Sequence, residues 1–185
     1  MAPSDDPACP LAPGEHFADI NGNTIHYTVR GAGPVLLLPS PGWGPSVDYL
    51  IPIPTLEQHC TVVYYDTRHS GRSTGPEDAS QYGLDHLVSD MEALRSHLGA
   101  ERVFVAGHSA GARQALTFGF RHNERVLGVV AISAMVCADS VRWEERARRI
   151  AARQHEPFYR DHPDYYSRGA ELLICLLYTS PSPRD

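Results

Sequence analysis

The sequence predicts an α/β protein whose central sheet is mostly parallel. Short apolar runs with strand character recur along the chain, and amphipathic helical patterns separate them. Strands that alternate with helices of this length are typical of parallel pairing through right-handed crossovers. With 185 residues, of which 42% are hydrophobic and 21% charged, the chain has the size and composition of one globular domain.

The first expected elements are two short strands at residues 16–22 and 23–31, which contain β-branched and aromatic residues. Asn21 and Gly22 separate them, and Asn-Gly favours a tight hairpin turn. We therefore expect an antiparallel hairpin of edge strands. Four further strands are expected at 34–40, 61–66, 102–107 and 126–134. Their almost continuous apolar character is typical of strands buried on both faces.

Two helices are expected between these strands. The first carries an apolar stripe and ends at Gly99; its stripe consists of Leu84, Leu87, Val88, Met91, Leu94 and Leu98. The second, residues 109–123, begins at Ser109. After Met135 the chain becomes helical, strongly charged and aromatic, with no further buried strand. This part is either a lid over the active edge of the sheet or a solvated helix pair.

The expected organisation is a disordered segment at 1–15, an α/β core at 16–138, the start of a helical lid at 139–174 and a tail at 175–185. The tail, CLLYTSPSPRD, resembles over its whole length the translated product of a transposon-type sequencing adapter. We therefore expect it to be non-native, with genuine sequence ending near Ile174. Its Ser/Pro composition alone would also permit a natural tail.

Charge and cysteine content exclude several functions. Acidic residues outnumber basic ones 22 to 16, and no basic stripe is present, so we expect no nucleic-acid partner. The four cysteines have neither zinc-ligand nor disulfide-framework spacing, so no metal or cofactor is expected. The acidic, proline-containing N-terminus does not resemble a signal peptide, and no apolar run reaches the roughly 18 residues that span a bilayer. We expect a cytoplasmic protein without a membrane partner; its oligomeric state is not predicted.

The segment Gly107-His108-Ser109-Ala110-Gly111 lies where one expected strand ends and the next helix begins. A sharp strand-to-helix turn strains its central residue and lifts that side chain above the sheet, which requires small residues on either side. The helix N-terminus behind Ser109 would stabilise negative charge. The alternative is a glycine-rich turn in which Ser109 is an ordinary helix cap.

Two further segments, PGWG at 41–44 and DTRHSGRS at 66–73, give the chain a specific resemblance. From residue 16 to about 174 it resembles the α/β-hydrolase superfamily, especially the prolyl-iminopeptidase-related branch. PGWG stands where that family has HGWG or HGGPG, whose backbone N–H supplies half of an oxyanion hole. The resemblance implies Trp43 as this donor, or Gly42 after a shift of one residue, and the N–H of Ala110 as the other. Taken alone, PGWGP is equally an ordinary turn with a buried Trp.

The second segment resembles the family's D-x-R-G-x-G-x-S turn, which is structural. The resemblance implies that Asp66 and Arg68 pair and hold their loop beside the strand-to-helix turn at residues 107–111, here called the elbow. His69 replaces the usual glycine, which places the backbone angles of that turn in question. A solvated charge cluster is the alternative interpretation.

The remaining catalytic groups of this family follow the serine in the order acid, then histidine. The sequence ends inside the expected lid, so both are expected to be absent from this chain. His108 is expected to point elsewhere on the elbow, and His155 and His162 lie in the charged helical part. Asp139 is either an early triad acid or a loop residue.

The resemblance implies acyl transfer, in which Ser109 attacks a small ester or a short-peptide amide without a cofactor or metal. An epoxide hydrolase or haloalkane dehalogenase would have Asp in place of Ser109. Three alternatives stay open: a prolyl aminopeptidase specifically, a non-catalytic ligand-binding protein on the same scaffold, and an inactive fragment.

Overall fold

The computed structural model describes residues 9–42, 44–51, 54–134, 144, 148, 151–153, 155–157 and 160. Its sheet has the strand order β1-β2-β4-β3-β5-β6. The strands are β1 (Gly14–Ile20), β2 (Asn23–Arg30), β3 (Val35–Pro39), β4 (Thr61–Tyr65), β5 (Val103–His108) and β6 (Val126–Ile132). β4, β3, β5 and β6 run parallel, while β1 and β2 are antiparallel to their neighbours. The mostly parallel α/β sheet is thus confirmed.

The hairpin forms as expected, but only one of its strands lies at an edge. Asn21 and Gly22 have φ of 49° and 78°, the paired left-handed conformation of a tight hairpin turn. β1 forms the edge, whereas β2 also pairs with β4, so the expectation of two edge strands was wrong for β2. Residues 26–29 of β2 are all buried, because elements cover both of its faces. β1 begins at Gly14, before the boundary expected at residue 16.

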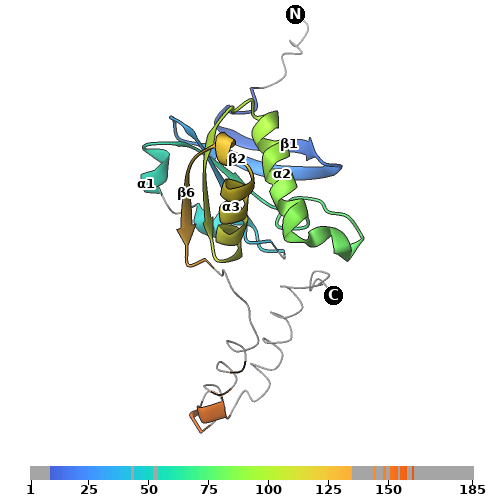
Figure 1. Ribbon diagram of the computed structural model, residues 1–185, viewed down its shortest axis with the longest axis vertical. Helices are drawn as coiled ribbons and strands as arrows, with labels where there is room; N and C mark the ends of the chain where they lie inside the picture. Colours follow the sequence, from blue (N-terminus) through green and yellow to red (C-terminus); the bar gives the residue numbers. More distant parts are fainter. Residues whose placement is uncertain are drawn as a thin grey trace, which may run out of the picture.

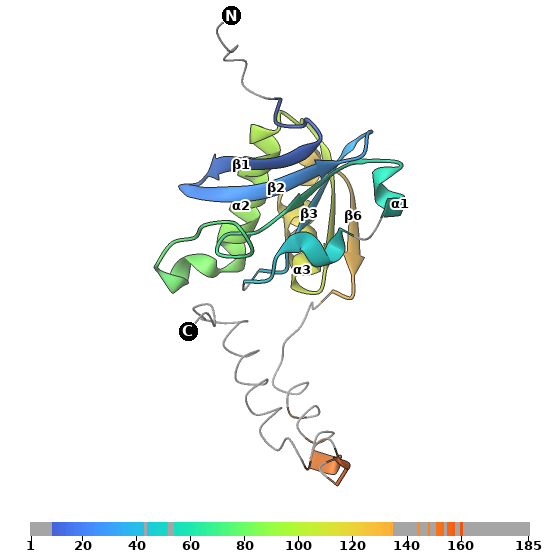
Figure 2. The same cartoon turned by 180° about the vertical axis from the view of Figure 1, so that it is seen from behind.

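The helices cover the sheet on two sides. α2 (Leu84–His97) and α3 (Ala110–Arg121) lie on the face seen in Figure 1. The 3₁₀ helix η1 (Val47–Leu50) and the short helix α1 (Pro54–Glu57) lie on the opposite face, seen in Figure 2. Two further 3₁₀ helices, η2 (Ala79–Tyr82) and η3 (Asn123–Arg125), precede α2 and β6. α2 ends before Gly99, as the sequence predicted. Gly99 has φ 67°, a left-handed conformation that glycine adopts readily because it has no β-carbon.

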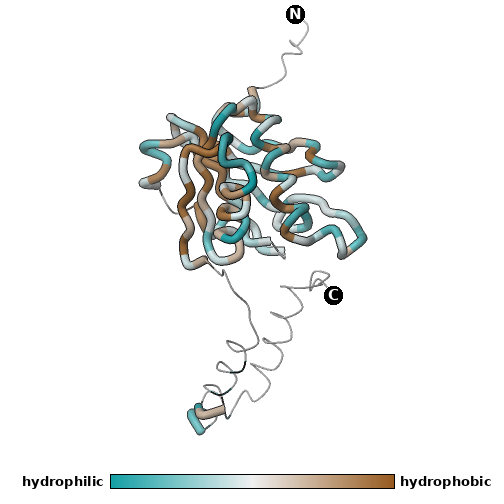
Figure 3. Tube along the Cα trace, in the orientation of Figure 1, coloured by the Kyte–Doolittle hydropathy of each residue, from teal (hydrophilic) through white to brown (hydrophobic). Residues whose placement is uncertain are grey.

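Two apolar layers make up the core, one on each face of the sheet. In β3, Leu37 packs with Met91 of α2 and Phe118 of α3, whereas Leu36 and Leu38 face η1. This double burial explains why the parallel strands are apolar without alternation. Figure 3 shows the hydrophobic residues gathered along these strands. None of the described helices is long and apolar enough to cross a bilayer.

β6 differs from the expectation of a strand buried on both faces. Four of its apolar side chains are 37% to 50% exposed; they are Leu127, Val129, Val130 and Ile132. Within the described residues β6 pairs only with β5, and α3 is the only helix of α1–α3 with extensive contacts to it. The expected lid at 139–174 is described at only a few residues, and the tail at 175–185 lies outside the described residues.

Candidate active site

Ser109 occupies a strained strand-to-helix turn. β5 ends at His108 and α3 begins at Ala110, so the helix starts one residue later than predicted. Between them Ser109 has φ 57° and ψ −116°, a conformation that costs a non-glycine residue about 1–3 kcal/mol. Its side chain makes no capping hydrogen bond, so it does not act as an ordinary helix cap. Its backbone N–H donates to the carbonyl oxygen of Ile132 at 2.9 Å, so the hydrogen bond of this residue links the turn to β6. Backbone strain of this kind is concentrated at functional sites.

The glycines on either side of Ser109 allow this turn. A β-carbon at Gly107 would overlap the backbone of Gly111 and Ala112, so the end of β5 and the first turn of α3 approach as closely as backbones can. A β-carbon at Gly111 would lie 3.3 Å from the carbonyl oxygen of Pro39, a tight contact with the end of β3. Both positions therefore meet the predicted need for small residues.

Gly107→Ala should lower the free energy of unfolding by about 3 kcal/mol, because backbone must move to admit the new methyl group. Gly83→Ala is the matched control: its φ is −63° and nothing lies within 4 Å of the added carbon. Because Gly83 caps α2, its replacement by alanine should lower the free energy of unfolding, but by less than about 1 kcal/mol. Urea denaturation of both variants measures the difference, and equal losses would contradict the close backbone approach.

Ala110 is the first residue of α3 and is buried. The first N–H groups of a helix have no carbonyl partner within the helix, and the helix dipole adds partial positive charge at this end. The N–H of Ala110 therefore has the chemical character of an oxyanion donor, next to the hydroxyl of Ser109.

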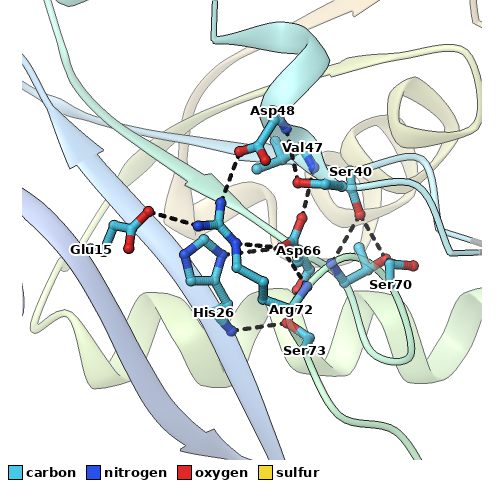
Figure 4. Close-up of polar contacts among 11 residues, drawn as sticks. Glu15, His26, Ser40, Val47, Asp48, Asp66, Ser70, Arg72 and Ser73 are labelled. Atoms are coloured by element: carbon cyan, nitrogen blue, oxygen red, sulfur yellow. Dashed lines mark hydrogen bonds and ion pairs between the residues drawn. The ribbon is translucent and has the colours of Figure 1, made fainter.

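The loop after β3 is described on both sides of Trp43, which itself lies outside the described residues. Thr67 donates its backbone N–H to the buried Ser40 Oγ at 3.0 Å. On the far side, Gly44 donates its N–H to Ser70 Oγ at 3.1 Å and accepts from the N–H of Gly71 at 2.8 Å. Both ends of the loop are thus fixed to the turn after β4, part of which is drawn in Figure 4.

Asp66 organises that turn. Its fully buried carboxylate accepts the N–H groups of Val47 at 2.7 Å and Arg72 at 2.9 Å, and it lies 3.1 Å from Nδ1 of His26 (Figure 4). Gly71 has φ 51°, and the space of its missing side chain is filled by this carboxylate. Asp66 therefore holds the start of η1 and the turn together.

The expected pairing of Asp66 with Arg68 is wrong. Arg68 donates Nε and Nη2 to the carboxylate of Asp90 on α2, each at 2.6 Å, in a buried ion pair. Asp66 instead contacts β2 and η1, so the two charges are directed to opposite faces of the sheet. Their burial also excludes a solvated cluster. His69 has φ 57°, so it adopts the left-handed conformation available to the glycine that it replaces.

His108 lies on the η1 side of the elbow. Its Nδ1 is 3.1 Å from the hydroxyl of Tyr49, and the two rings meet edge to face. Burial raises the pKa of Tyr49 above its ordinary value. A tyrosine hydroxyl is protonated at neutral pH even without this shift, so it can donate a hydrogen bond. His108 thus has a partner on η1, in agreement with the expectation that it points elsewhere. His155 is exposed, whereas His162 and Asp139 lie outside the described residues.

Several buried polar residues beside the elbow were not predicted. Ser40, Thr67 and Ser70 form one hydroxyl network. Gln114 of α3 reaches two carbonyls of the loop after β3. The only signal for Gln114 is a polar residue on an otherwise apolar helix face, between Gly111 and Phe118. Across the described part of the chain, no group of three or more His, Cys, Asp or Glu side chains is placed to hold a metal ion.

A cavity of about 640 Å³ lies elsewhere on the molecule. Its lining includes Glu15, Asp48 and Arg72 but no residue of the elbow. Arg72 already pairs with both carboxylates, at 2.7 and 2.9 Å. This cavity is therefore not the place where a substrate would meet Ser109.

Comparison with known proteins agrees with this fold. A family model described as alpha/beta hydrolase fold matches residues 33–176. The chain is 32% identical to a proline iminopeptidase of Saccharolobus solfataricus over 65% of its length and 41% of the relative's. It is 36% identical to a soluble epoxide hydrolase of Corynebacterium sp. (strain C12), over 60% of the chain and 38% of the relative.

Among solved structures, a proline iminopeptidase-related protein from Thermus thermophilus superposes with a TM-score of 0.58 at 27% identity, covering 64% of this chain and 44% of the other. The chain thus spans about two fifths of the length of the curated relatives it matches.

Proposed function

Because this chain belongs to the alpha/beta hydrolase fold family, we propose that the complete protein is a serine hydrolase that cleaves a small ester or amide bond through an acyl-enzyme on Ser109. One observation carries the proposal: Ser109 is held at φ 57° between a strand and a helix, without a capping hydrogen bond that would explain the strain. Such strain is typical of sites where the backbone presents a reactive side chain.

In the first half of the reaction, Ser109 Oγ attacks the carbonyl carbon of the substrate and passes its proton to a general base. The electron pair of the C=O bond moves to the oxygen. The resulting oxyanion accepts hydrogen bonds from the N–H of Ala110 and from one N–H of the loop after β3. We assign the loop donor to Trp43; a shift of one residue would make Gly42 the donor instead. We assign the base to a histidine that follows residue 174 in the complete protein.

Collapse of the tetrahedral intermediate breaks the bond to the leaving alcohol or amine, which takes the proton back from the base. Water then attacks the acyl-enzyme by the same route and releases the acid. Preorganised donors of this kind lower the barrier because they are already oriented when charge develops, and one such donor accounts for about 100- to 1000-fold in rate.

A prolyl aminopeptidase is the second candidate, favoured by the similarity to the proline iminopeptidase of S. solfataricus. The similarity to an epoxide hydrolase supports a different chemistry less well, because Ser109 stands where such an enzyme is expected to have an aspartate. A serine ester hydrolyses readily, whereas the alkyl ether that Ser109 would form with an epoxide does not.

The test is a substrate panel with the complete gene product: p-nitrophenyl butyrate, L-proline p-nitroanilide and styrene oxide. We expect hydrolysis of the ester, with an initial burst of one equivalent of p-nitrophenol if deacylation is slow. Turnover of the proline anilide as well would select the aminopeptidase. Turnover of styrene oxide alone, or binding of ligands without any turnover, would contradict the proposal.

A further inference from the structure

Gln114 lies on the face of α3 that is turned toward the end of β3. It follows Ala110 by four residues, so the two share one side of the helix. Its side chain is almost completely buried. Its Nε2 lies 3.4 Å from the carbonyl oxygen of Ser40 and 3.3 Å from that of Pro41, the two residues that lead into the segment around Trp43.

We propose that Gln114 is a positioning residue that fixes the loop after β3 against α3 and thereby sets the distance between the two oxyanion donors. The inference rests on the function proposed above, and it concerns residues that do not touch the substrate. One donor belongs to the loop and the other, Ala110, to the helix. Their spacing is useful only if loop and helix are held together.

The other anchors of the loop do not provide this link. Ser40 is bound to Thr67, and Gly44 to Ser70 and Gly71, all in the turn after β4. These bonds position the loop relative to β4, whereas Ala110 moves with α3. Gln114 joins the loop to α3 directly. Misplacement of a catalytic group by about 1 Å is enough to cost about 100-fold in rate.

The chemistry of the side chain fits this role. Two carbonyl oxygens face the same point, and a carboxamide supplies two N–H donors without the charge that burial would penalise. Among the described residues, Gln114 Oε1 has no hydrogen-bond partner although it is buried. A buried acceptor without a hydrogen-bond partner lowers the free energy of unfolding, so packing alone would favour an apolar residue at this position. The two donors are the property that an apolar residue lacks.

The test uses Gln114→Met in the complete gene product, since methionine keeps the length of the side chain and removes both donors. We expect kcat for p-nitrophenyl butyrate to fall about 10- to 100-fold with KM changed less than about twofold. The rate constant for labelling by a fluorophosphonate should fall by the same factor, because both reactions pass through an oxyanion. Thr117→Val is the matched control on α3. Thr117 is half-buried, its hydroxyl donates to the backbone carbonyl of Arg113 at 2.8 Å, and its replacement should change neither rate.

A folded Gln114→Met protein with wild-type kcat, or with a change in KM alone, would overturn the positioning role. If this variant does not fold, Gln114→Asn, which keeps the amide but withdraws it by one methylene, is judged by the same criteria. If neither folds, Gln114 is a structural residue and the proposal is wrong. Failure of the proposed function is distinguishable, because the wild-type protein itself would then remain unlabelled at Ser109.

Discussion

Replacing Ser109 with alanine should lower kcat of the complete gene product for p-nitrophenyl butyrate by about 10⁴- to 10⁶-fold. The variant has no oxygen to attack the carbonyl carbon, so the covalent route is closed. The oxyanion donors and the binding of substrate would persist and leave a small residual rate over water. KM should change little, because the serine contributes to bond making rather than to binding of the ground state.

Ser96→Ala is the control for this substitution. Ser96 is exposed on α2, and its loss should leave kcat within about twofold of the wild type. A Ser109→Ala enzyme that keeps more than a few per cent of the wild-type kcat would place the nucleophile at another residue. Equal ligand binding by an inactive wild-type protein would instead favour the non-catalytic scaffold.

The second large loss of activity is expected for residues 1–174 expressed without any further sequence. We expect kcat/KM at least about 10³-fold below that of the complete gene product, although the turn at Ser109 is present. Without a general base the serine hydroxyl stays protonated and is a weak nucleophile. Equal turnover by both proteins would show that a base lies within these residues, and His108, His155 and His162 would then be replaced first.

The same fragment should also be poorly soluble. The apolar side chains of β6 are exposed on both faces, and within the described residues only β5 pairs with this strand. An exposed apolar edge strand is a template for association with further copies. Size-exclusion chromatography of the two proteins at equal concentration measures this, and a monodisperse fragment would contradict it.

Sequence alone predicted the strands and helices because their signals are local. Apolar runs bounded by Gly and Pro mark buried strands, and Asn21-Gly22 marks the hairpin turn. The position of a strand within the sheet, by contrast, depends on residues that are distant in sequence. β2 and β6 carry strand patterns that look alike whether a neighbour covers them or not, which is why one was wrongly placed at an edge and the other was wrongly expected to be buried.

In the candidate site, too, features that depend on nearby residues could be predicted from sequence, and contacts between distant residues could not. Gly107, Ser109 and Gly111 could be identified because the turn depends on residues close in sequence. The partners of Asp66 and Arg68 could not, because a buried charge is paired by whatever element packs on it, here His26 and Asp90, and not by its neighbour in the chain. Gln114 bonds to a carbonyl 74 residues away, so its pattern signals burial but not the loop that it contacts.

Mapping of a fluorophosphonate adduct by mass spectrometry tests the central claim most directly. In the complete gene product, we expect one phosphonyl group on the peptide that contains Ser109, and fragmentation should assign it to that residue. Ser109→Ala should carry no adduct at all. An adduct on any other residue, or an unlabelled Ser109 in a protein that still hydrolyses p-nitrophenyl butyrate, would contradict the assignment of Ser109 as the nucleophile.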